Sequence, residues 1–156
     1  MSTILIRPAT LADAEIIARF NAAIALETEH LTLNPHRLLK GVQAVLTDSS
    51  KGFYIVAEAD GSIVGQIMIT YEWSDWRNGV FWWIQSVYVE PAYRKQKIFS
   101  QLYHTIEQMA TDDGTVCGVR LYVERANTRA QTVYENLGMH PTVYEMYETD
   151  FVMGKE

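Results

Sequence analysis

An apolar strand turns through a proline into a cationic helix start at Ser86-Val87-Tyr88-Val89-Glu90-Pro91-Ala92-Tyr93-Arg94-Lys95-Gln96-Lys97-Ile98. The first N–H groups of a helix lack acceptors inside the helix and carry a partial positive charge, so a helix start attracts phosphate. Three cations in the turn, Arg94, Lys95 and Lys97, would reinforce that attraction. The stretch therefore predicts a site for a phosphorylated cofactor.

The length and composition of the chain predict one globular domain over residues 1–156. Of the 156 residues, 48% are hydrophobic and 21% charged, which is enough apolar material for one core and too little length for two. The net charge of -6 argues against a general nucleic-acid or membrane-surface binder, because both need a basic surface. No apolar run approaches the roughly 20 residues that span a bilayer. The single Cys117 forms no internal disulfide and the N-terminus lacks a secretory-signal pattern, so we expect a cytoplasmic protein.

Hydrophobic periodicity and turn signals predict the element order β-α-α-β-β-β-α-β-α-β, typical of an α/β (α+β) fold. Thr10 and Asp13 resemble a capping box, Asn34-Pro35 predicts a helix start, and Asp60-Gly61 is a strong two-residue hairpin signal. The predicted strands cover residues 4–6, 53–59, 63–73, 80–89, 119–124 and 142–150, and the helices start near residues 10, 34, 98 and 127. A crossover helix between strands 80–89 and 119–124 implies that these two strands are parallel.

A second motif follows the cationic turn about 40 residues later and reads Asn127-x-x-Ala130-x-x-x-Tyr134-Glu135-x-x-Gly138-Met139. The two motifs in this order resemble the GNAT superfamily of acetyl-CoA-dependent N-acetyltransferases, and the resemblance spans nearly the whole chain. It implies a central mixed, mostly antiparallel sheet with flanking helices, and acetyl-CoA as the cosubstrate. The pyrophosphate would lie on the turn before the long helix, and the pantetheine would run along residues 87–89.

The resemblance assigns cofactor binding to Val87, Tyr88, Val89, Arg94, Lys95, Gln96, Lys97, Ile98, Phe99, Ser100, Asn127 and Tyr134. The turn departs from the family pattern at two glycine-like positions, which hold Lys97 and Phe99. Glycine allows the closest backbone approach to a phosphate and permits positive φ. A negative φ would let Lys97 keep its N–H facing the ligand while its ammonium adds attraction. Phe99 has to point away from the cofactor or reshape the pocket.

Acetyl transfer to an amine needs a neutral nitrogen, a stabiliser for the developing oxyanion and a proton for the departing thiolate. The resemblance gives the last role to Tyr134, whose phenol has an ordinary pKa of about 10. A buried core tyrosine would look the same in sequence. By the same resemblance, a backbone N–H near Val87 would stabilise the oxyanion.

The group that removes the proton of the amine is a separate question. Many relatives place a glutamate near the position of Gln85, and an amide has no useful basicity, so another group or ordered water has to take this proton. Glu72 is the first choice because desolvation by its aromatic neighbours, Tyr71 and Trp73, would strengthen a carboxylate base. An exposed strand-end carboxylate fits the same pattern equally well.

Aromatic and acidic side chains are the expected contacts of the acceptor, because both suit a cationic amine. They are Glu27, Glu29, Trp73 and Trp82. Strand alternation sends Trp82 and Trp83 to opposite faces, so at most one of them lines a given cleft. A core or a dimer surface accounts for the aromatic residues equally well. The four histidines show no metal-ligand spacing and Cys117 lacks a nearby histidine motif, so no metal site is expected.

The leading hypothesis is an acyltransferase that moves an acetyl group from acetyl-CoA to a primary amine of a small cationic molecule. A peptide N-terminus or a lysine as acceptor would require an open groove. A third hypothesis is an acyl-CoA-binding regulatory domain, in which Gln85 and the missing glycines mark lost catalysis. The expected partners are the small-molecule amine and a second copy of the chain, because homodimers are the commonest oligomers. Neither a nucleic acid nor a membrane is expected as a partner.

Overall fold

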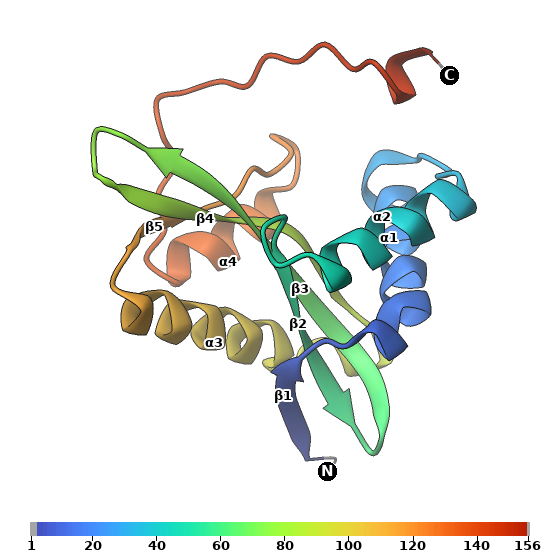
Figure 1. The fold of residues 1–156 in the computed structure, drawn as a ribbon. Coiled ribbons are helices and arrows are strands. Elements are labelled where there is room, and N and C mark those ends of the chain that lie inside the picture. The colour runs from blue at the N-terminus through green and yellow to red at the C-terminus, as the bar shows by residue number, and fades with distance from the viewer. Residues whose placement is uncertain (1–2, 156) are drawn as a thin grey trace. The chain divides into compact units, whose positions relative to one another are not determined.

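The computed structural model describes residues 3–155, and the chain divides into two compact units, Met1–Leu121 and Tyr122–Glu156 (Figure 1). The main elements of the first unit are β1 (Ile4–Pro8), α1 (Ala14–Glu29), α2 (Pro35–Thr47), β2 (Phe53–Ala59), β3 (Ser62–Ser74), β4 (Gly79–Val89), α3 (Ile98–Asp113) and β5 (Val116–Arg120). Short 3-10 helices cover Leu11–Asp13, Pro91–Tyr93 and Met153–Lys155, and the second unit contains α4 (Thr128–Asn136). The single domain over residues 1–156 stays a prediction.

The five strands of the first unit form one sheet in the order β1-β2-β3-β4-β5. Neighbouring strands from β1 to β4 are antiparallel, whereas β4 and β5 are parallel. Parallel neighbours need a crossover connection, and α3 supplies it (Figure 1). The predicted mixed, mostly antiparallel sheet and its one parallel pair are therefore confirmed.

Helices cover both faces of this sheet. On one face, Tyr54 and Val56 of β2 pack with Ala14 and Ile17 of α1 and with Val42 of α2. The side chains of β3 alternate between the faces, and on the other face Ile98 of α3 lies directly against Gly65 of β3. The strand that carries the predicted cofactor contacts is thus held between two helical layers.

Local signals set most element boundaries. The Asp13 carboxylate accepts the N–H of Thr10 at 2.8 Å, and the Asn34 side chain accepts the N–H of Arg37 at 3.0 Å, so both predicted helix starts are confirmed. The β2–β3 hairpin turns at Asp60-Gly61, where both residues have positive φ, 51° and 81°. Such two-residue turns match the twist of the flanking strands.

Two predicted strands need correction. β5 covers Val116–Arg120 and not residues 119–124, because the chain then enters a turn in which the carbonyl of Glu124 accepts the N–H of Asn127 at 3.0 Å. Residues 142–150 form no strand, and Tyr147 within them is 94% exposed. Large apolar side chains in this segment come in adjacent pairs, Val143-Tyr144 and Met146-Tyr147, so neither alternating set gives one apolar face.

Candidate active site

The edge of β4 that faces away from β3 is paired with β5 along only part of its length. Residues 80–83 pair with β5, and no strand pairs with residues 84–89 on that side within the described part of the chain. The N–H of Glu90 bonds to the carbonyl oxygen of Val64 at 2.8 Å, so alternation directs the backbone groups of residues 86 and 88 to β3 as well. Val87 and Val89 therefore direct their N–H and C=O groups to the open edge. The carbonyl oxygen of Val89 accepts a hydrogen bond from Arg94 there, and an extended ligand can pair with both N–H groups and with the carbonyl oxygen of Val87.

A β-bulge separates the two halves of β4. Ser86 lies opposite Met68 and Ile84 lies opposite Ile69, so Gln85 is the extra residue. The Gln85 amide donates to the Thr70 hydroxyl at 2.8 Å. Bulges bend a strand and re-aim its backbone groups, and this one lies where β4 leaves β5.

The turn between β4 and α3 has a backbone conformation that favours glycine. Lys95 has a φ of 65° and Lys97 a φ of 62°, both in the left-handed region. A residue with a Cβ pays roughly 1–2 kcal/mol for this conformation. The negative φ considered for Lys97 is therefore wrong, and a lysine takes the conformation usually left to glycine. Such strain persists only where the surroundings hold it in place.

The start of α3 is left open by its own sequence. Lys97 is the N-cap residue, its side chain makes no capping hydrogen bond, and the first turn contains no acidic residue. The first N–H groups of an α-helix have no acceptor within the helix, and the side chain of Lys97 does not supply one here. The buried Ile98 side chain anchors this end in the core, and the Phe99 ring packs along α3 toward Tyr103, with ring centroids 6.2 Å apart. The Phe99 ring therefore lies along the side of α3, next to Tyr103.

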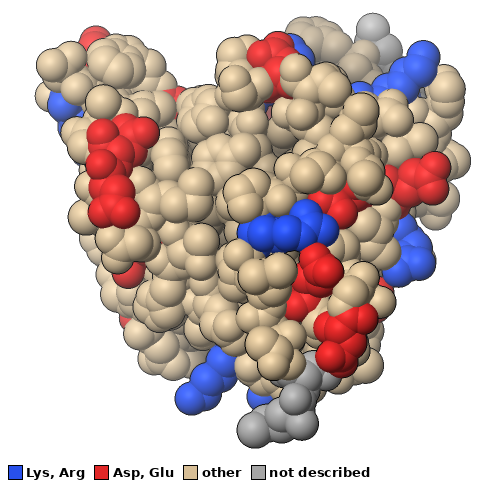
Figure 2. All heavy atoms as spheres, turned by 60° about the horizontal axis from the view of Figure 1, so that its bottom comes forward, with Lys and Arg blue, Asp and Glu red and all other residues tan. Residues whose placement is uncertain are grey.

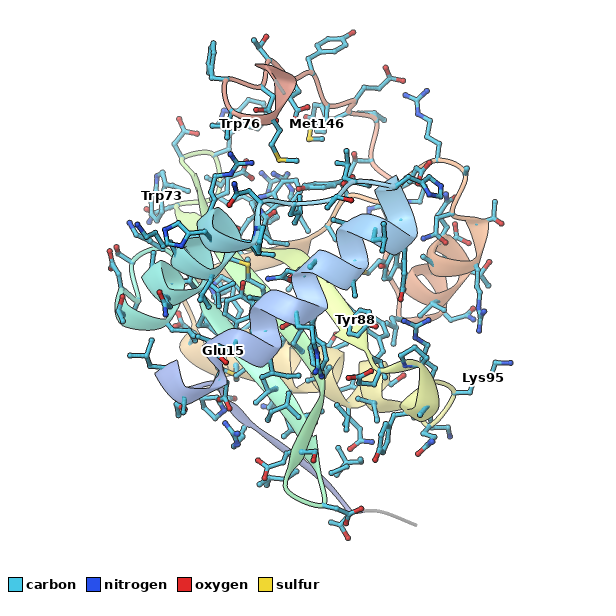
Figure 3. All side chains as sticks on the ribbon, turned by 90° about the vertical axis from the view of Figure 1, so that its right-hand side faces the viewer. Glu15, Trp73, Trp76, Tyr88, Lys95 and Met146 are labelled. Atoms are coloured by element: carbon cyan, nitrogen blue, oxygen red, sulfur yellow. The ribbon has the colours of Figure 1, made fainter. Side chains whose placement is uncertain are left out.

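The side chains of the cationic turn point in different directions. The Lys95 side chain points away from the first unit in Figure 3. Arg94 instead points back, because its Nε donates to the carbonyl oxygen of Val89 at 2.8 Å and its Nη2 donates to Glu27 at 3.1 Å. Gln96 also folds back, since its amide donates to the carbonyl oxygen of Ala92 at 3.3 Å.

Glu27, Tyr88 and Arg94 form one cluster, although the sequence assigned them to separate acceptor and cofactor contacts. The Arg94 guanidinium lies 5.4 Å from the centroid of the Tyr88 ring, and the Tyr88 hydroxyl donates to the second oxygen of Glu27 at 3.4 Å. Burial, together with the neighbouring Glu27 charge, raises the pKa of the Tyr88 phenol. The carboxylate of Glu27 is therefore shared between a cation and a phenol.

The structure does not bring Glu72 to Val87. In the register of the sheet, Glu72 lies opposite a β4 residue six positions before Val87, which corresponds to about 20 Å along a strand. Its carboxylate accepts a hydrogen bond from Arg120 at 2.6 Å, and its side chain is 45% exposed. The expected enclosure by Tyr71 and Trp73 is wrong, because the neighbours of a strand residue point to the opposite face.

The other predicted acceptor contacts lie apart. Trp82 is 6% exposed and meets Phe53 edge to face with ring centroids 5.1 Å apart, so it is a core residue and the predicted acceptor role is corrected. Trp73 is 64% exposed and lies near the β3–β4 hairpin together with Trp76 (Figure 3), at the end of β4 away from the turn. Glu29 is the exposed last residue of α1.

In the second unit, α4 is completed by its own residues. The Asn127 side chain accepts the N–H of Ala130 at 3.1 Å, so the predicted cofactor contact caps the helix. At the other end Gly138 has a φ of 92°, and the N–H of Met139 bonds to the carbonyl oxygen of Tyr134 at 3.1 Å, the pattern of a glycine C-cap. The Tyr134 side chain is half-buried, and burial raises the pKa of its phenol above the ordinary value. The phenol therefore holds its proton at neutral pH.

Several polar residues of the first unit were missed from the sequence. The buried Gln66 of β3 donates to Asn21 of α1 at 2.7 Å, and Asn21 donates to the hydroxyl of Tyr54 at 3.2 Å. Arg19 of α1 lies 3.3 Å from Glu90 at the start of the turn. These contacts join segments that are far apart in the sequence, so no local spacing could have indicated them.

Charge and metal-ligand patterns add no further site. Basic and acidic side chains are interspersed over the face in Figure 2. Among residues 3–155, no group of three or more His, Cys, Asp and Glu residues is placed to hold a metal ion. None of the helices in the described part of the chain is long and apolar enough to cross a membrane.

Comparisons with known proteins point to one family. The family model described as the Acetyltransferase (GNAT) family matches residues 22–139. At 47% identity and a TM-score of 0.89, the chain is similar to the crystal structure of a possible acetyltransferase from Clostridium difficile 630, with 96% of this chain and 98% of that chain covered.

Two more distant solved structures share the fold. The aminoglycoside N-acetyltransferase AAC(6')-Iy in complex with CoA has 16% identity and a TM-score of 0.80, with 97% of both chains covered. The ribosomal-protein-alanine N-acetyltransferase from Brucella melitensis biovar Abortus 2308 has 17% identity and a TM-score of 0.74, with 96% of this chain and 100% of that chain covered. A search of curated proteins gave no match.

Proposed function

The chain belongs to the GNAT family of acetyltransferases, and from this membership we propose that it transfers the acetyl group of acetyl-CoA to a primary amine of a small cationic molecule. GNAT acetyltransferases are acyltransferase enzymes, so the open choices concern the acceptor and the residues that serve it. The hypothesis of a regulatory domain without catalysis finds no support in the family match.

One continuous path carries the proposal. The open edge at Val87 and Val89 offers peptide groups to an extended amide chain, and it leads directly into the uncapped start of α3 with Lys95 and Lys97. Peptide edges suit the amides of a pantetheine, whereas helix N–H groups and ammonium groups suit phosphates. The bound cosubstrate would supply an activated acetyl thioester, and the residues of this path fit it.

In the proposed mechanism, the N–H of Val87 donates to the thioester oxygen as negative charge develops on it. The acceptor nitrogen forms the new C–N bond while the C–S bond breaks, and Tyr134 donates its phenolic proton to the departing thiolate. The surplus proton of the amine passes to water, because the Gln85 amide is no base and Glu72 of β3 lies opposite a β4 residue six positions before Val87.

The C-terminal end of α1 favours a cationic acceptor. A helix C-terminus carries partial negative charge, and Glu29, the last residue of α1, adds a full negative charge there. Glu27 shares its charge with Arg94, which leaves Glu29 as the carboxylate that we assign to the acceptor. A small ammonium-bearing molecule matches the negative charge of Glu29 at this helix end.

A screen for amine-dependent thiol release from acetyl-CoA tests the proposal. Polyamines, aminoglycosides, amino acids and peptides are compared, and a blank without amine corrects for the thiol of Cys117. We expect release with small cationic amines, and a several-fold higher KM for them in Glu29→Gln, since an exposed ionic contact contributes up to about 1 kcal/mol. Release with peptides alone would transfer the assignment to a protein acceptor, and no release with any amine would reject the proposal.

A further inference from the structure

Two ion pairs connect α1 to the turn before α3. Arg19 lies 3.3 Å from Glu90, where the turn begins, and Glu27 lies 3.1 Å from Arg94, in its middle. The two α1 residues are eight positions apart, or about two helical turns. We call Arg19, Glu27, Glu90 and Arg94 the α1–turn clamp.

The clamp is anchored in the core through Tyr88. The Tyr88 ring packs on the buried Phe20 of α1 with ring centroids 4.8 Å apart, and its hydroxyl donates to Glu27. The Arg94 guanidinium lies over the Tyr88 ring, 5.4 Å from its centroid, and also donates to the carbonyl oxygen of Val89. Figure 3 shows Tyr88 beside α1, with Lys95 projecting beyond it. One end of the turn is therefore fixed to both the helix and the strand.

The strained residues lie directly after the clamped ones. Lys95 and Lys97 hold left-handed conformations that cost roughly 1–2 kcal/mol each for a residue with a Cβ. The side chain of Lys97, the N-cap residue of α3, makes no capping hydrogen bond. Strain of this kind persists only where tertiary contacts determine the conformation, and the clamp supplies such contacts at Glu90 and Arg94.

We propose that Glu27, Glu90 and Arg94 are positioning residues, which hold the backbone of residues 95–97 in the form that receives the cofactor phosphates. Arg94 acts through the turn and not as a direct ligand of the phosphates. The inference rests on the proposed function, because the ligand is taken to be CoA. It adds to that function a mechanical role for α1 in cofactor binding.

For Glu27 and Glu90, an effect of charge alone and a positioning role predict opposite changes in CoA affinity when the residue is made neutral. Glu27 and Glu90 place negative charge beside a site for phosphates, so simple electrostatics predicts tighter CoA binding when either residue becomes neutral. Positioning predicts weaker binding, because the turn loses a point of attachment. The sign of the change therefore separates the two explanations.

Calorimetric titration with CoA of the wild-type chain, Glu27→Gln and Glu90→Gln measures this sign. The matched control is Glu15→Gln, which removes the same charge from an exposed position at the other end of α1 (Figure 3). We expect Kd to rise about two- to fivefold in both clamp variants, the range of an exposed ion pair, and to stay unchanged in the control. Unchanged or tighter binding in both clamp variants would overturn the proposal.

Arg94→Lys and Arg94→Gln test whether the guanidinium acts on the ligand itself. A lysine keeps the charge but cannot reach Val89 and Glu27 with two separate donors. Positioning predicts that both variants weaken CoA binding alike, with the wild-type slope of log Kd against log salt. Recovery in the lysine variant, or a shallower slope in the glutamine variant, would assign Arg94 to the phosphates and refute the clamp.

Amide hydrogen exchange without ligand separates the clamp from the proposed function. Faster exchange of residues 94–100 in Glu27→Gln and Glu90→Gln, but not in Glu15→Gln, would support the clamp by itself. Equal exchange in all four proteins would overturn it. If the wild-type chain binds no CoA while these exchange differences are present, the proposed function fails and the clamp stands.

Discussion

The two helices that carry the motifs of the family, α3 and α4, begin in opposite ways. Asn127 caps α4 with its own side chain, whereas Lys97 begins α3 in a left-handed conformation and without a cap. At its far end α4 uses Gly138 where a left-handed residue is needed, which is the choice that avoids strain. α4 is thus completed locally, while the turn that leads into α3 makes its ion pairs with the distant helix α1. A helix start that its own sequence leaves open is the place where a ligand can complete it.

The largest effect is expected for chemistry at the locally completed helix. Tyr134→Phe should lower kcat about 100-fold or more, because the departing thiolate loses its proton donor. CoA affinity should stay the same if binding belongs to the start of α3. Initial rates of thiol release and the Kd of CoA measure the two quantities. An unchanged kcat would leave Tyr134 as a packing residue of α4.

The pH dependence of kcat in the wild-type chain and in Tyr134→Phe tests whether Tyr134 is the proton donor. Burial raises the pKa of Tyr134, so the phenol is protonated at neutral pH and ionises only above its ordinary value of about 10. Ionisation removes the proton that the thiolate needs, so wild-type kcat should fall only at strongly alkaline pH. The phenylalanine variant should lack this alkaline limb.

A medium effect is expected at the cap of α4. Asn127→Ala removes the acceptor for the N–H of Ala130 and should lower the free energy of unfolding by about 1 kcal/mol. Asn127→Asp keeps an acceptor and serves as the control that restores stability. Urea unfolding measures the change. Weaker CoA binding in both variants, with the aspartate variant fully stable, would instead make Asn127 a direct cofactor contact.

The smallest change in stability is expected at the start of α3. In Lys97→Gly, relief of the left-handed strain is offset by the greater freedom of glycine in the unfolded chain, so the free energy of unfolding should change by less than about 1 kcal/mol. CoA affinity should fall and depend less on salt, because an ammonium is lost. Unchanged affinity and an unchanged salt response would show that Lys97 contributes backbone shape alone.

Elements with local signals could be predicted from the sequence. The cap at Asn34, the hairpin at Asp60-Gly61 and the glycine that ends α4 depend on neighbouring residues, and all three are where the pattern placed them. The predicted strand at residues 142–150 is wrong because its large apolar residues come in adjacent pairs, so no alternating set gives one apolar face for a sheet.

The candidate site could be predicted only in part. The open edge at Val87 and the cationic start of α3 follow from a strand, a proline and a basic cluster. The inward turn of Arg94 toward Glu27 joins residues 67 positions apart, and the burial of Trp82 depends on which face meets α3. Glu72 was a candidate base because of its neighbours in sequence. The register of the sheet, which the sequence does not reveal, places it opposite a β4 residue six positions before Val87.

The bulge at Gln85 has a consequence for any attempt to re-engineer β4. Before it, the even-numbered residues turn their peptide groups outward, as when the N–H of Val80 bonds to the carbonyl oxygen of Thr115 at 3.0 Å. After it, the odd-numbered Val87 and Val89 do so. At the bulge, the peptide groups that face away from β3 therefore change from those of even-numbered to those of odd-numbered residues. The facing of residues before and after Gln85 has to be worked out separately. Inserting one residue between the bulge and Val87 would turn the proposed oxyanion donor toward β3, although no side chain had been altered.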